Sequence, residues 1–323
     1  GTMIGYGCYV LLHEISAAAK RTRFNILKTA AAQVPLVVVI LAFLGITIIY
    51  DRQELGNLEI GFSSRIDMSD VKVTTNEIYN SKSESAAVYK VPVYTENETK
   101  KFVEDFFASQ GQVIDDSRTD LYDETAVYYS TEQNSLWIDY TGGTMNYTDY
   151  TVTFGDDLDE ESYSESVAGA DEATVRKALS AYGINVPEGA LFRELTGDSP
   201  GYEFVVSQQS EGSLFYDGSL YCTLYEGEKF GEISNHILSC EKYKEYPVLS
   251  ENEAMQQIEG GDFCYFSQDG DEIKSIDLGK VTMKYVVDSK NYYQPVYSFE
   301  ACVNGEKEYE IDIPALKNIS GEE

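Results

Sequence analysis

The stretch PVYTENE at residues 92–98 returns almost unchanged as PVLSENE at residues 247–253. In each copy a Thr or Ser stands three residues before a Glu, which is the pattern of a capping box. The hydroxyl oxygen accepts a hydrogen bond from a backbone N–H in the first helical turn, and the Glu accepts one from the backbone N–H of the Thr or Ser. The repeat therefore predicts that one helix begins at Thr95 and another at Ser250.

The predicted helices carry apolar stripes and end at glycines. After Thr95 the stripe consists of Phe102, Val103 and Phe106, spaced as one face of a helix requires. Glycine ends a helix readily because it adopts a left-handed backbone at little cost. The starts and stops of the three predicted helices are Thr95 and Gly111, Asp171 and Gly183, and Ser250 and Gly260-Gly261.

Between these helices apolar and polar residues alternate, which is typical of half-buried antiparallel strands. Two predicted strand faces consist of Tyr202, Phe204 and Val206, and of Leu220, Cys222 and Leu224. Asp217-Gly218 and Glu226-Gly227 are predicted to be turns, because both dipeptides have the composition that turns favour.

The last two strands are predicted to form a hairpin around Asn304-Gly305. A two-residue turn there would place apolar residues of one strand opposite glutamates of the other. A three-residue loop at 303–305, with the glycine in a left-handed bulge, keeps the apolar side chains together. That register pairs Phe299 with Tyr309 and Tyr297 with Ile311.

These elements predict an α+β fold, in which an antiparallel sheet packed with a helix occurs at least twice in tandem. An acidic, serine-rich stretch at 156–169 is predicted to link the two modules. The other predicted divisions are a cytoplasmic tail at 1–28, a transmembrane helix at 29–50, a membrane-proximal segment at 51–86, a first module at 87–155 and a larger second module at 170–323.

Residues 29–50 read TAAAQVPLVVVILAFLGITIIY, with no charge and Gln33 as the one strongly polar side chain. As a helix this run is about 33 Å long, enough to cross a hydrocarbon core of about 30 Å. Four basic residues precede it, which favours a cytoplasmic N-terminus and an external C-terminal part. We prefer an uncleaved anchor to a signal peptide, because no small-residue cleavage site follows, and to a buried core helix, which is usually shorter. Met3 is compatible with an initiator and with a longer upstream chain.

The chain of 323 residues has 55 Asp and Glu against 24 Lys and Arg, a formal charge of −31. Residues 1–50 contain four basic residues and one acid, so residues 51–323 carry −34. A nucleic-acid partner is not expected, because phosphate binding requires clustered Lys and Arg. Aromatic residues, at 13% of the chain, are plentiful enough to build a folded core. The external part is therefore predicted to be a folded, acidic body that attracts cations or basic protein surfaces.

The second half of the chain resembles a known group of envelope proteins in the order of its elements. Between residues 185 and 316 this order includes strands on either side of Asp217-Gly218, the helix capped by Ser250, and the closing Ile313-Pro314-Ala315-Leu316. It resembles the extracytoplasmic part of the YycI/YycH regulatory proteins of Gram-positive bacteria and, more loosely, PepSY-type modules. The resemblance implies a protein that is not an enzyme and that modulates a membrane histidine kinase. No cofactor is expected. The basic cytoplasmic stretch is longer than is usual in that group.

Four cysteines lie in the predicted external part: Cys222, Cys240, Cys264 and Cys302. They pair as disulfides, which an oxidising exterior permits, or remain thiols. The alternation of Cys222 with leucines is equally typical of a buried thiol that acts as a small apolar side chain. Both interpretations remain open from the sequence.

No residue is predicted to be catalytic, cofactor-binding or metal-ligating. His236 is expected to be a packed or edge residue. The acidic run 156–161 and Asp269-Gly270-Asp271 lack the spacing of a calcium loop, so a solvated linker and a turn are expected there. Trp137 and the many tyrosines are expected to pack on a sheet, with a platform for carbohydrate or peptide as the alternative.

These observations lead to the principal hypothesis of a single-pass membrane protein whose external part binds another membrane or envelope protein, such as a two-component sensor kinase. The predicted contact with the lipid bilayer is made by residues 29–50. The alternative is a surface module that binds cell-wall glycan, peptide or a divalent cation. A hydrolase that uses paired carboxylates is a third hypothesis, for which no motif selects the pair.

Overall fold

A computed structural model describes residues 54–58, 60, 65–80, 84–122, 125–153, 169–196, 201–265, 272–305 and 307–317. The chain divides into Gly1–Gly56 and Asn57–Glu323, and nearly all of the described residues belong to the second unit. The predicted transmembrane helix at 29–50 and almost all of the predicted linker at 156–169 lie outside them. Within the described ranges no helix is long and apolar enough to cross a membrane.

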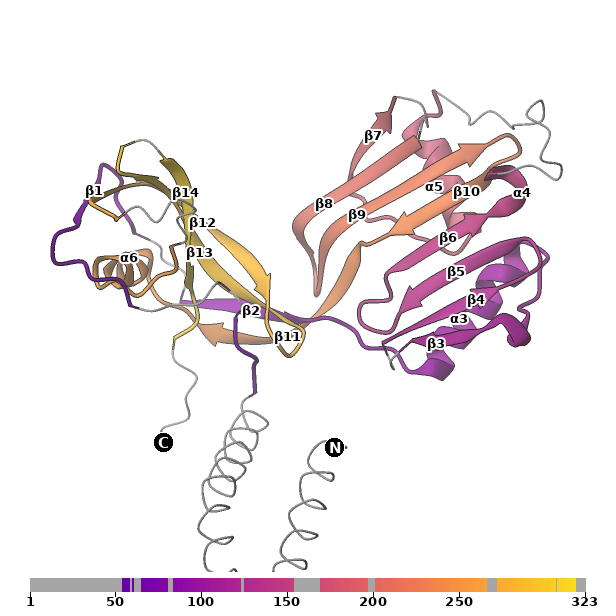
Figure 1. Cartoon of the computed structure of the whole chain (residues 1–323), viewed down its shortest axis with the longest axis horizontal. Helices are drawn as coiled ribbons and strands as arrows, with labels where there is room; N and C mark the ends of the chain where they lie inside the picture. The colour runs from indigo at the N-terminus through magenta and orange to yellow at the C-terminus, as the bar shows by residue number, and fades with distance from the viewer. Residues whose placement is uncertain are drawn as a thin grey trace, which may run out of the picture. The chain divides into compact units, whose positions relative to one another are not determined.

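In the second unit a helix is followed three times by antiparallel strands that pair in chain order (Figure 1). The first group is α3 (Glu96–Ser109), β3 (Asp120–Tyr122), β4 (Ala126–Ser130), β5 (Asn134–Asp139) and β6 (Met145–Asp149). The second is α5 (Glu172–Ala181), β7 (Leu191–Leu195), β8 (Gly201–Glu211), β9 (Leu214–Tyr225) and β10 (Lys229–Asn235). The third is α6 (Glu251–Glu259), β12 (Ser275–Val287), β13 (Tyr292–Val303) and β14 (Lys307–Pro314).

The strands form one hydrogen-bonded sheet in the order β1-β12-β13-β2-β11-β9-β10-β6-β5-β4-β3, and β14, β7 and β8 pair off this path. The elements outside the three groups are β1 (Lys72–Thr75), β2 (Ser85–Lys90), β11 (Leu238–Pro247), the 3-10 helix η1 (Asp116–Arg118) and the short α4 (Tyr150–Thr153). The described part of the chain is therefore mostly β-sheet with few helices, which confirms the predicted α+β class.

All three predicted helices begin at their predicted caps. Complete capping boxes are present at Thr95 and Ser250, and Asp171 accepts a hydrogen bond from the backbone N–H of Thr174 at 2.8 Å. Left-handed glycines follow each helix, at Gly111, Gly183 and Gly261. The local capping and stop chemistry was sufficient to predict these elements.

The apolar stripe of α3 differs from the predicted one. Val103 and Phe106 are buried as predicted, but Phe102 is 37% exposed. The buried face consists of Thr99, Val103, Phe106 and Phe107. Steps of three and four residues separate Thr99, Val103 and both phenylalanines, so these side chains share one face of the helix. Phe102 lies beside this face, so its predicted place in the core is wrong.

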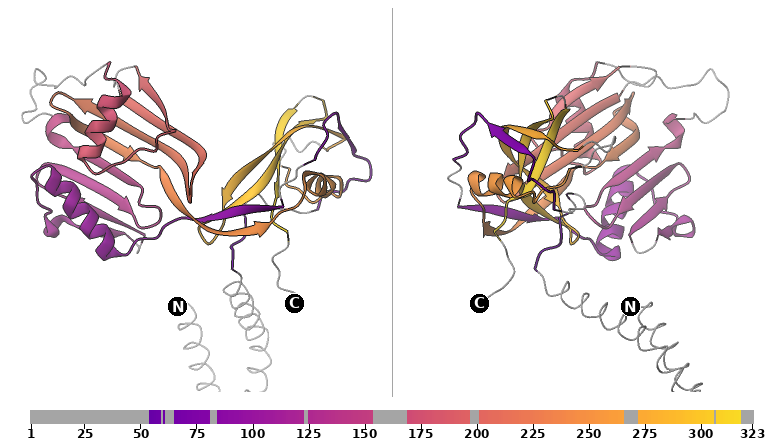
Figure 2. Two further views of the ribbon diagram at one scale, coloured as in Figure 1. Left: turned by 180° about the vertical axis from the view of Figure 1, so that it is seen from behind. Right: turned by 60° about the vertical axis from the view of Figure 1, so that its left-hand side comes forward.

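Two main cores are built on this sheet. Helices α3 and α5 lie on the same sheet face, where their apolar side chains pack with those of β4–β6 and β8–β10 (Figure 2). The second core contains Ala254 and Ile258 of α6 and side chains of β12–β14. The first core includes residues from both sides of 156–169, so the cores do not follow the predicted division there. The physical reason is that β6 pairs with β10, which continues one sheet across both segments.

The predicted faces of β8 and β9 are correct, but one of the predicted turns is wrong. Tyr202, Phe204 and Val206 are buried, as are Leu220, Cys222 and Leu224. Glu226-Gly227 is a turn, whereas β9 continues through Asp217-Gly218. Gly218 has φ +119°, and a Cβ there would lie 2.2 Å from the carbonyl oxygen of His236. The glycine therefore serves a bend within a strand, where the partner of β9 changes from β11 to β10.

The final hairpin has a three-residue loop, but its register differs by two residues from the prediction. Val303 pairs with Lys307, so Phe299 faces Ile311 and Tyr297 faces Ile313. The shift keeps the same side chains on the apolar face. Its cause is non-local: the side-chain carbonyl oxygen of Asn304 accepts hydrogen bonds from the backbone N–H groups of Lys274 and Ser275, at 2.7 and 3.2 Å.

Candidate binding groove

Among the residues that the structure describes, a groove of about 490 Å³ lies on the helix-bearing face of the first core. This volume is within the range of ligand sites, about 300–1,000 Å³. One wall comes from the start of α3, the other from the segment after α5, and the floor from the sheet. Its lining residues are Tyr94, Glu98, Thr99, Phe102, Ile138, Gly142, Gly143, Met145, Gly183, Ile184, Asn185, Pro187, Tyr216, Asn235, Ile237 and Ser239.

Aromatic side chains stand at the α3 wall. Phe102 is 37% exposed and Tyr94 is 41% exposed, although both are large and apolar. A Cβ at Gly143 would lie 2.9 Å from the ring of Tyr94, so the absence of a side chain there makes room for that ring. Burial raises the pKa of Tyr94, with smaller contributions from Cys240, Glu241 and Glu98. The wall therefore offers apolar contact area with negative charge close by.

Glu98 is the charged residue in the lining. Its Oε2 accepts hydrogen bonds from the backbone N–H of Thr95 at 2.9 Å and from the Thr95 hydroxyl at 2.7 Å. These two hydrogen bonds lower the pKa of Glu98, so the side chain is a carboxylate at neutral pH. Its Oε1 has no hydrogen-bond partner among the described residues. The groove thus contains a carboxylate that is fixed by one oxygen and open at the other.

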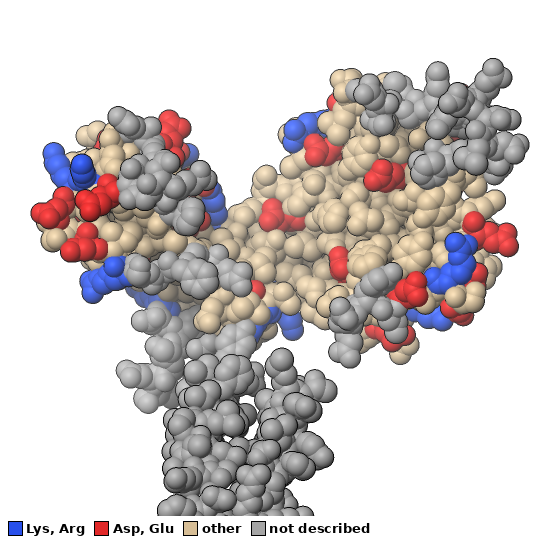
Figure 3. Space-filling view, viewed as in Figure 1, with Lys and Arg blue, Asp and Glu red and all other residues tan. Residues whose placement is uncertain are grey.

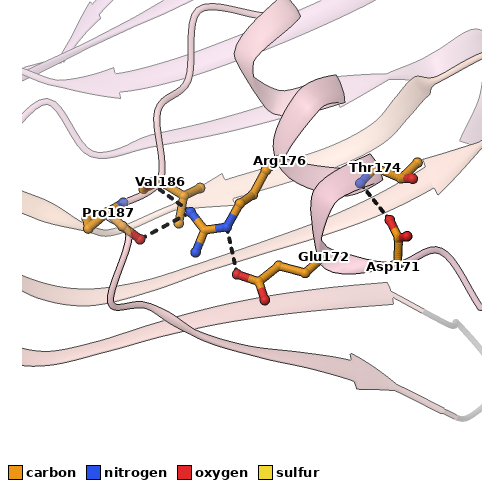
Figure 4. A network of polar contacts seen from close by, with 6 residues as sticks. All are labelled: Asp171, Glu172, Thr174, Arg176, Val186 and Pro187. Carbon is orange, nitrogen blue, oxygen red and sulfur yellow. Dashed lines mark hydrogen bonds and ion pairs between the residues drawn. The ribbon is translucent and has the colours of Figure 1, made fainter.

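A half-buried arginine fixes the opposite wall (Figure 4). Arg176 of α5 donates from Nη1 to the carbonyl oxygens of Val186 and Pro187, at 2.8 and 3.1 Å. Its Nε donates to Glu172 at 2.7 Å, and its guanidinium carbon lies 4.9 Å from the centre of the Phe204 ring. The guanidinium therefore ties the end of the 183–187 segment to α5 and to the core.

A second hollow, of about 720 Å³, is lined by carboxylates near the second core. The acidic lining residues are Glu77, Asp277, Glu300, Glu308 and Glu310. All five are exposed, Asp277 accepts a hydrogen bond from the Thr74 hydroxyl, and Glu310 pairs with Lys284 at 2.6 Å. Ligand sites are lined mainly by apolar and aromatic side chains, whereas five of the eleven residues that line this hollow are exposed carboxylates. We therefore take the groove as the candidate site.

The four cysteines considered in the sequence analysis differ in their exposure. Cys222 and Cys240 are buried free thiols, and burial raises the pKa of each to about 12. Cys302 is a half-buried free thiol, and Cys264 is also half-buried. The thiol interpretation is therefore correct for Cys222, and a disulfide among Cys222, Cys240 and Cys302 is not formed.

Other sequence candidates are not among the residues that line the groove. His236 is exposed at the end of β10, with Nε2 3.0 Å from the Ser234 hydroxyl. Trp137 is half-buried on β5, on the sheet face opposite the helices. The acidic run 156–161 and Asp269-Gly270-Asp271 lie outside the described residues. Within the described part of the chain, no group of three His, Cys, Asp or Glu side chains could hold a metal ion.

The sequence did not reveal the groove. Phe102 was expected in the core and Glu98 was identified only as a helix cap. The available signal was that Phe102 and Glu98 are four residues apart, and therefore neighbours on α3, one apolar and one charged. Nothing local indicates that the 183–187 segment lies opposite them.

Comparisons with known proteins identify no family for this chain. No family model matches it, and no curated protein matches it. An uncharacterized protein from Eubacterium rectale has 11% identity and a TM-score of 0.30, over 77% of this chain and 88% of its own. The Bacillus megaterium YpeB C-terminal domain has 12% identity and a TM-score of 0.27, over 70% of this chain and 100% of its own. These comparisons do not support the resemblance to the YycI/YycH group.

Proposed function

We propose that this chain is a membrane-anchored, extracytoplasmic binding protein that regulates a protein partner in the cell envelope, such as a two-component sensor kinase. Residues 29–50 are the anchor in this proposal, and the acidic body that follows lies outside the membrane. The observation that carries the proposal is the groove, since it combines exposed aromatic side chains with two fixed walls. Such surfaces bind protein segments because burying the aromatic area is favourable, and because fixed walls lose little conformational entropy when a ligand binds.

The proposal includes a relation to PepSY-type modules. A helix followed by antiparallel strands, three times over, agrees with the looser resemblance to PepSY-type modules that the sequence suggested. The proposal needs only a body that presents a groove outside the cell. It therefore does not depend on a relation to the YycI/YycH proteins.

Photo-crosslinking in intact cells tests the proposed function. A photoreactive residue replaces Phe102 in the groove, and a matched variant carries it at Val113, which is 84% exposed and does not line the groove. We expect an adduct with a membrane or envelope protein from position 102 and none from position 113. We also expect external protease to reach the body in intact cells. Equal adducts from both positions, or a body protected from protease, would contradict the proposal.

A second candidate function, binding of cell-wall glycan, is favoured by one row of side chains on the helix-free face of the sheet. Cross-strand pairs connect Tyr128 to Trp137, Trp137 to Asn146, Asn146 to Ser234 and Ser234 to Tyr221. The neighbours of these residues along each strand face the first core, so this row faces away from it. Figure 3 shows few charged residues on the visible face over β5, β6, β9 and β10.

Rings and hydroxyl groups in such a row match the faces and edges of sugars. Sedimentation with purified wall fragments tests this function. We expect Trp137→Ala to reduce the bound fraction and Phe102→Ala to leave it unchanged. If the wild-type chain does not sediment with the fragments, this second function is wrong.

A further inference from the structure

We infer that the groove binds a peptide segment that presents a cationic group, from Lys, Arg or a chain terminus, to Glu98 and lays the neighbouring apolar side chains on the groove floor. This inference rests on the proposed function and names the chemistry of the partner. It excludes an acidic segment, a neutral apolar segment and a second copy of this chain as the occupant.

The carboxylate of Glu98 is prepared for a cation. One oxygen is held by Thr95 at 2.7 and 2.9 Å, so the side chain is already oriented before a ligand arrives. The other oxygen has no hydrogen-bond partner among the residues that the structure describes. A ligand ammonium or guanidinium there gains a charge-assisted hydrogen bond without the cost of ordering the acceptor.

The remaining lining selects what accompanies the cation. Phe102 stands one helical turn from Glu98 on α3, and Ile138, Met145 and Ile237 contribute apolar surface from the sheet. When a cationic group of the peptide binds Glu98, the side chains next to it in the peptide can therefore reach this apolar surface. Lys and Arg suit this position because their aliphatic stems can follow the apolar wall while the charge reaches the carboxylate.

The charge of the surroundings decides between possible occupants. The residues that line the groove include no Lys or Arg, while Glu188 follows the lining residue Pro187 and Glu241 acts on Tyr94. An acidic occupant would place like charges together, which is unfavourable. The chain's own stretch 156–169 is acidic, and a second copy also carries −31. A basic, apolar segment of another protein is the complementary occupant.

The chain offers a matched control for this inference at Glu253. Its Oε2 accepts hydrogen bonds from the Ser250 backbone N–H at 2.7 Å and the Ser250 hydroxyl at 3.0 Å, as Glu98 does at Thr95. Glu253 does not line the groove and lies 3.9 Å from the ammonium of Lys317. Glu98→Gln and Glu253→Gln therefore make the same change to a capping box, and only the first makes it in the groove.

The experiment uses the full chain in nanodiscs of zwitterionic lipid and a random library of displayed 12-residue peptides. We expect selection on the wild type and on Glu253→Gln to enrich Lys and Arg beside apolar residues at least threefold over the unselected library. Selection on Glu98→Gln should lose this enrichment. The best wild-type peptide is then synthesised together with its Lys-to-Gln version, and both affinities are measured by fluorescence anisotropy.

We expect the cationic peptide to bind the wild type and Glu253→Gln about tenfold more tightly than its Gln version, the size of one charge-assisted hydrogen bond. Glu98→Gln should bind both peptides alike, at the affinity of the Gln version. The inference is overturned if no peptide is enriched, if the enrichment survives in Glu98→Gln, or if Glu253→Gln removes it. If the peptide experiment fails but the crosslinker at position 102 still forms an adduct with an envelope protein, the inference is wrong and the proposed function stands. An adduct at that position to a second copy, or within the chain, would overturn both.

Discussion

Replacing Gly218 by Ala should destabilise the fold strongly, because two separate effects act at this residue. Its φ of +119° lies outside the regions that residues with a side chain adopt readily, and a Cβ would stand 2.2 Å from the His236 carbonyl oxygen. The first effect costs about 1–2 kcal/mol. The second forces the backbone of the β10–β11 connection to move, and such overpacking costs about 1–3 kcal/mol. We therefore expect a loss of about 3 kcal/mol.

Gly212 provides the matched control. It has φ +62° in the turn between β8 and β9, and a Cβ there would meet nothing within 4 Å. Gly212→Ala therefore keeps the backbone effect without the clash and should cost about 1 kcal/mol.

Urea unfolding followed by the fluorescence of Trp137, the single Trp, measures both variants. With a slope of about 3 kcal/mol per molar urea, the midpoint should fall by about 1 M for Gly218→Ala and about 0.3 M for Gly212→Ala. Equal shifts would refute the argument that β9 passes under the His236 carbonyl.

Three further predictions concern the caps, the core and the thiols. Hydrogen bonds from the N-caps lower the pKa of Glu98 and Glu253 below 4.5, so their stabilisation is complete above that pH and is lost as the pH falls below it. Each Gln variant should reduce the dependence of the urea midpoint on acid pH, and an unchanged dependence would contradict this. Tyr147 donates to Gln110 at 2.6 Å and accepts from the buried Asn134, so Tyr147→Phe should cost about 1–3 kcal/mol in the same urea assay. With a pKa of about 12, Cys222 and Cys240 are thiolates in about one molecule in ten thousand at pH 8. Iodoacetamide should therefore modify Cys302 well before either of them in the native chain, as mapped by mass spectrometry; fast modification of Cys222 would show that the core around β9 opens.

The parts of the fold that the sequence predicted are those decided within a few residues. A Thr or Ser, an acid three positions on and a glycine at the end determine where α3 and α6 begin and end. The alternation along β8 and β9 likewise predicted which side chains are buried. In each case the competing structures differ within one turn of helix or one strand pair, so local chemistry was enough.

The errors arose where a distant segment decides the outcome. Asp217-Gly218 was predicted to be a turn, but Gly218 is a bend within β9, where the backbone passes close to the His236 carbonyl oxygen. The register of the last hairpin shifted because Asn304 is bound by Lys274 and Ser275, thirty residues away. Phe102 left the core because the buried face of α3 is centred on Val103 and Phe107. None of these causes is visible in a short window of sequence.

The two copies of the repeat show why similar sequences can acquire different roles. The strand that precedes each copy, β2 or β11, pairs antiparallel with the other, with Val88 opposite Lys244. The chain therefore leaves the pair in opposite directions, and α3 joins the first core while α6 joins the second.

At the end of each path the same capping Glu meets different neighbours. Glu98 faces a groove whose far wall comes from residues 183–187, and Glu253 faces the ammonium of Lys317. The capping box provides an oriented carboxylate in both copies, and the tertiary structure places only Glu98 in the lining of the groove. A binding role for Glu98 thus follows from where β2 and β11 direct their helices, which no feature of the repeat itself encodes.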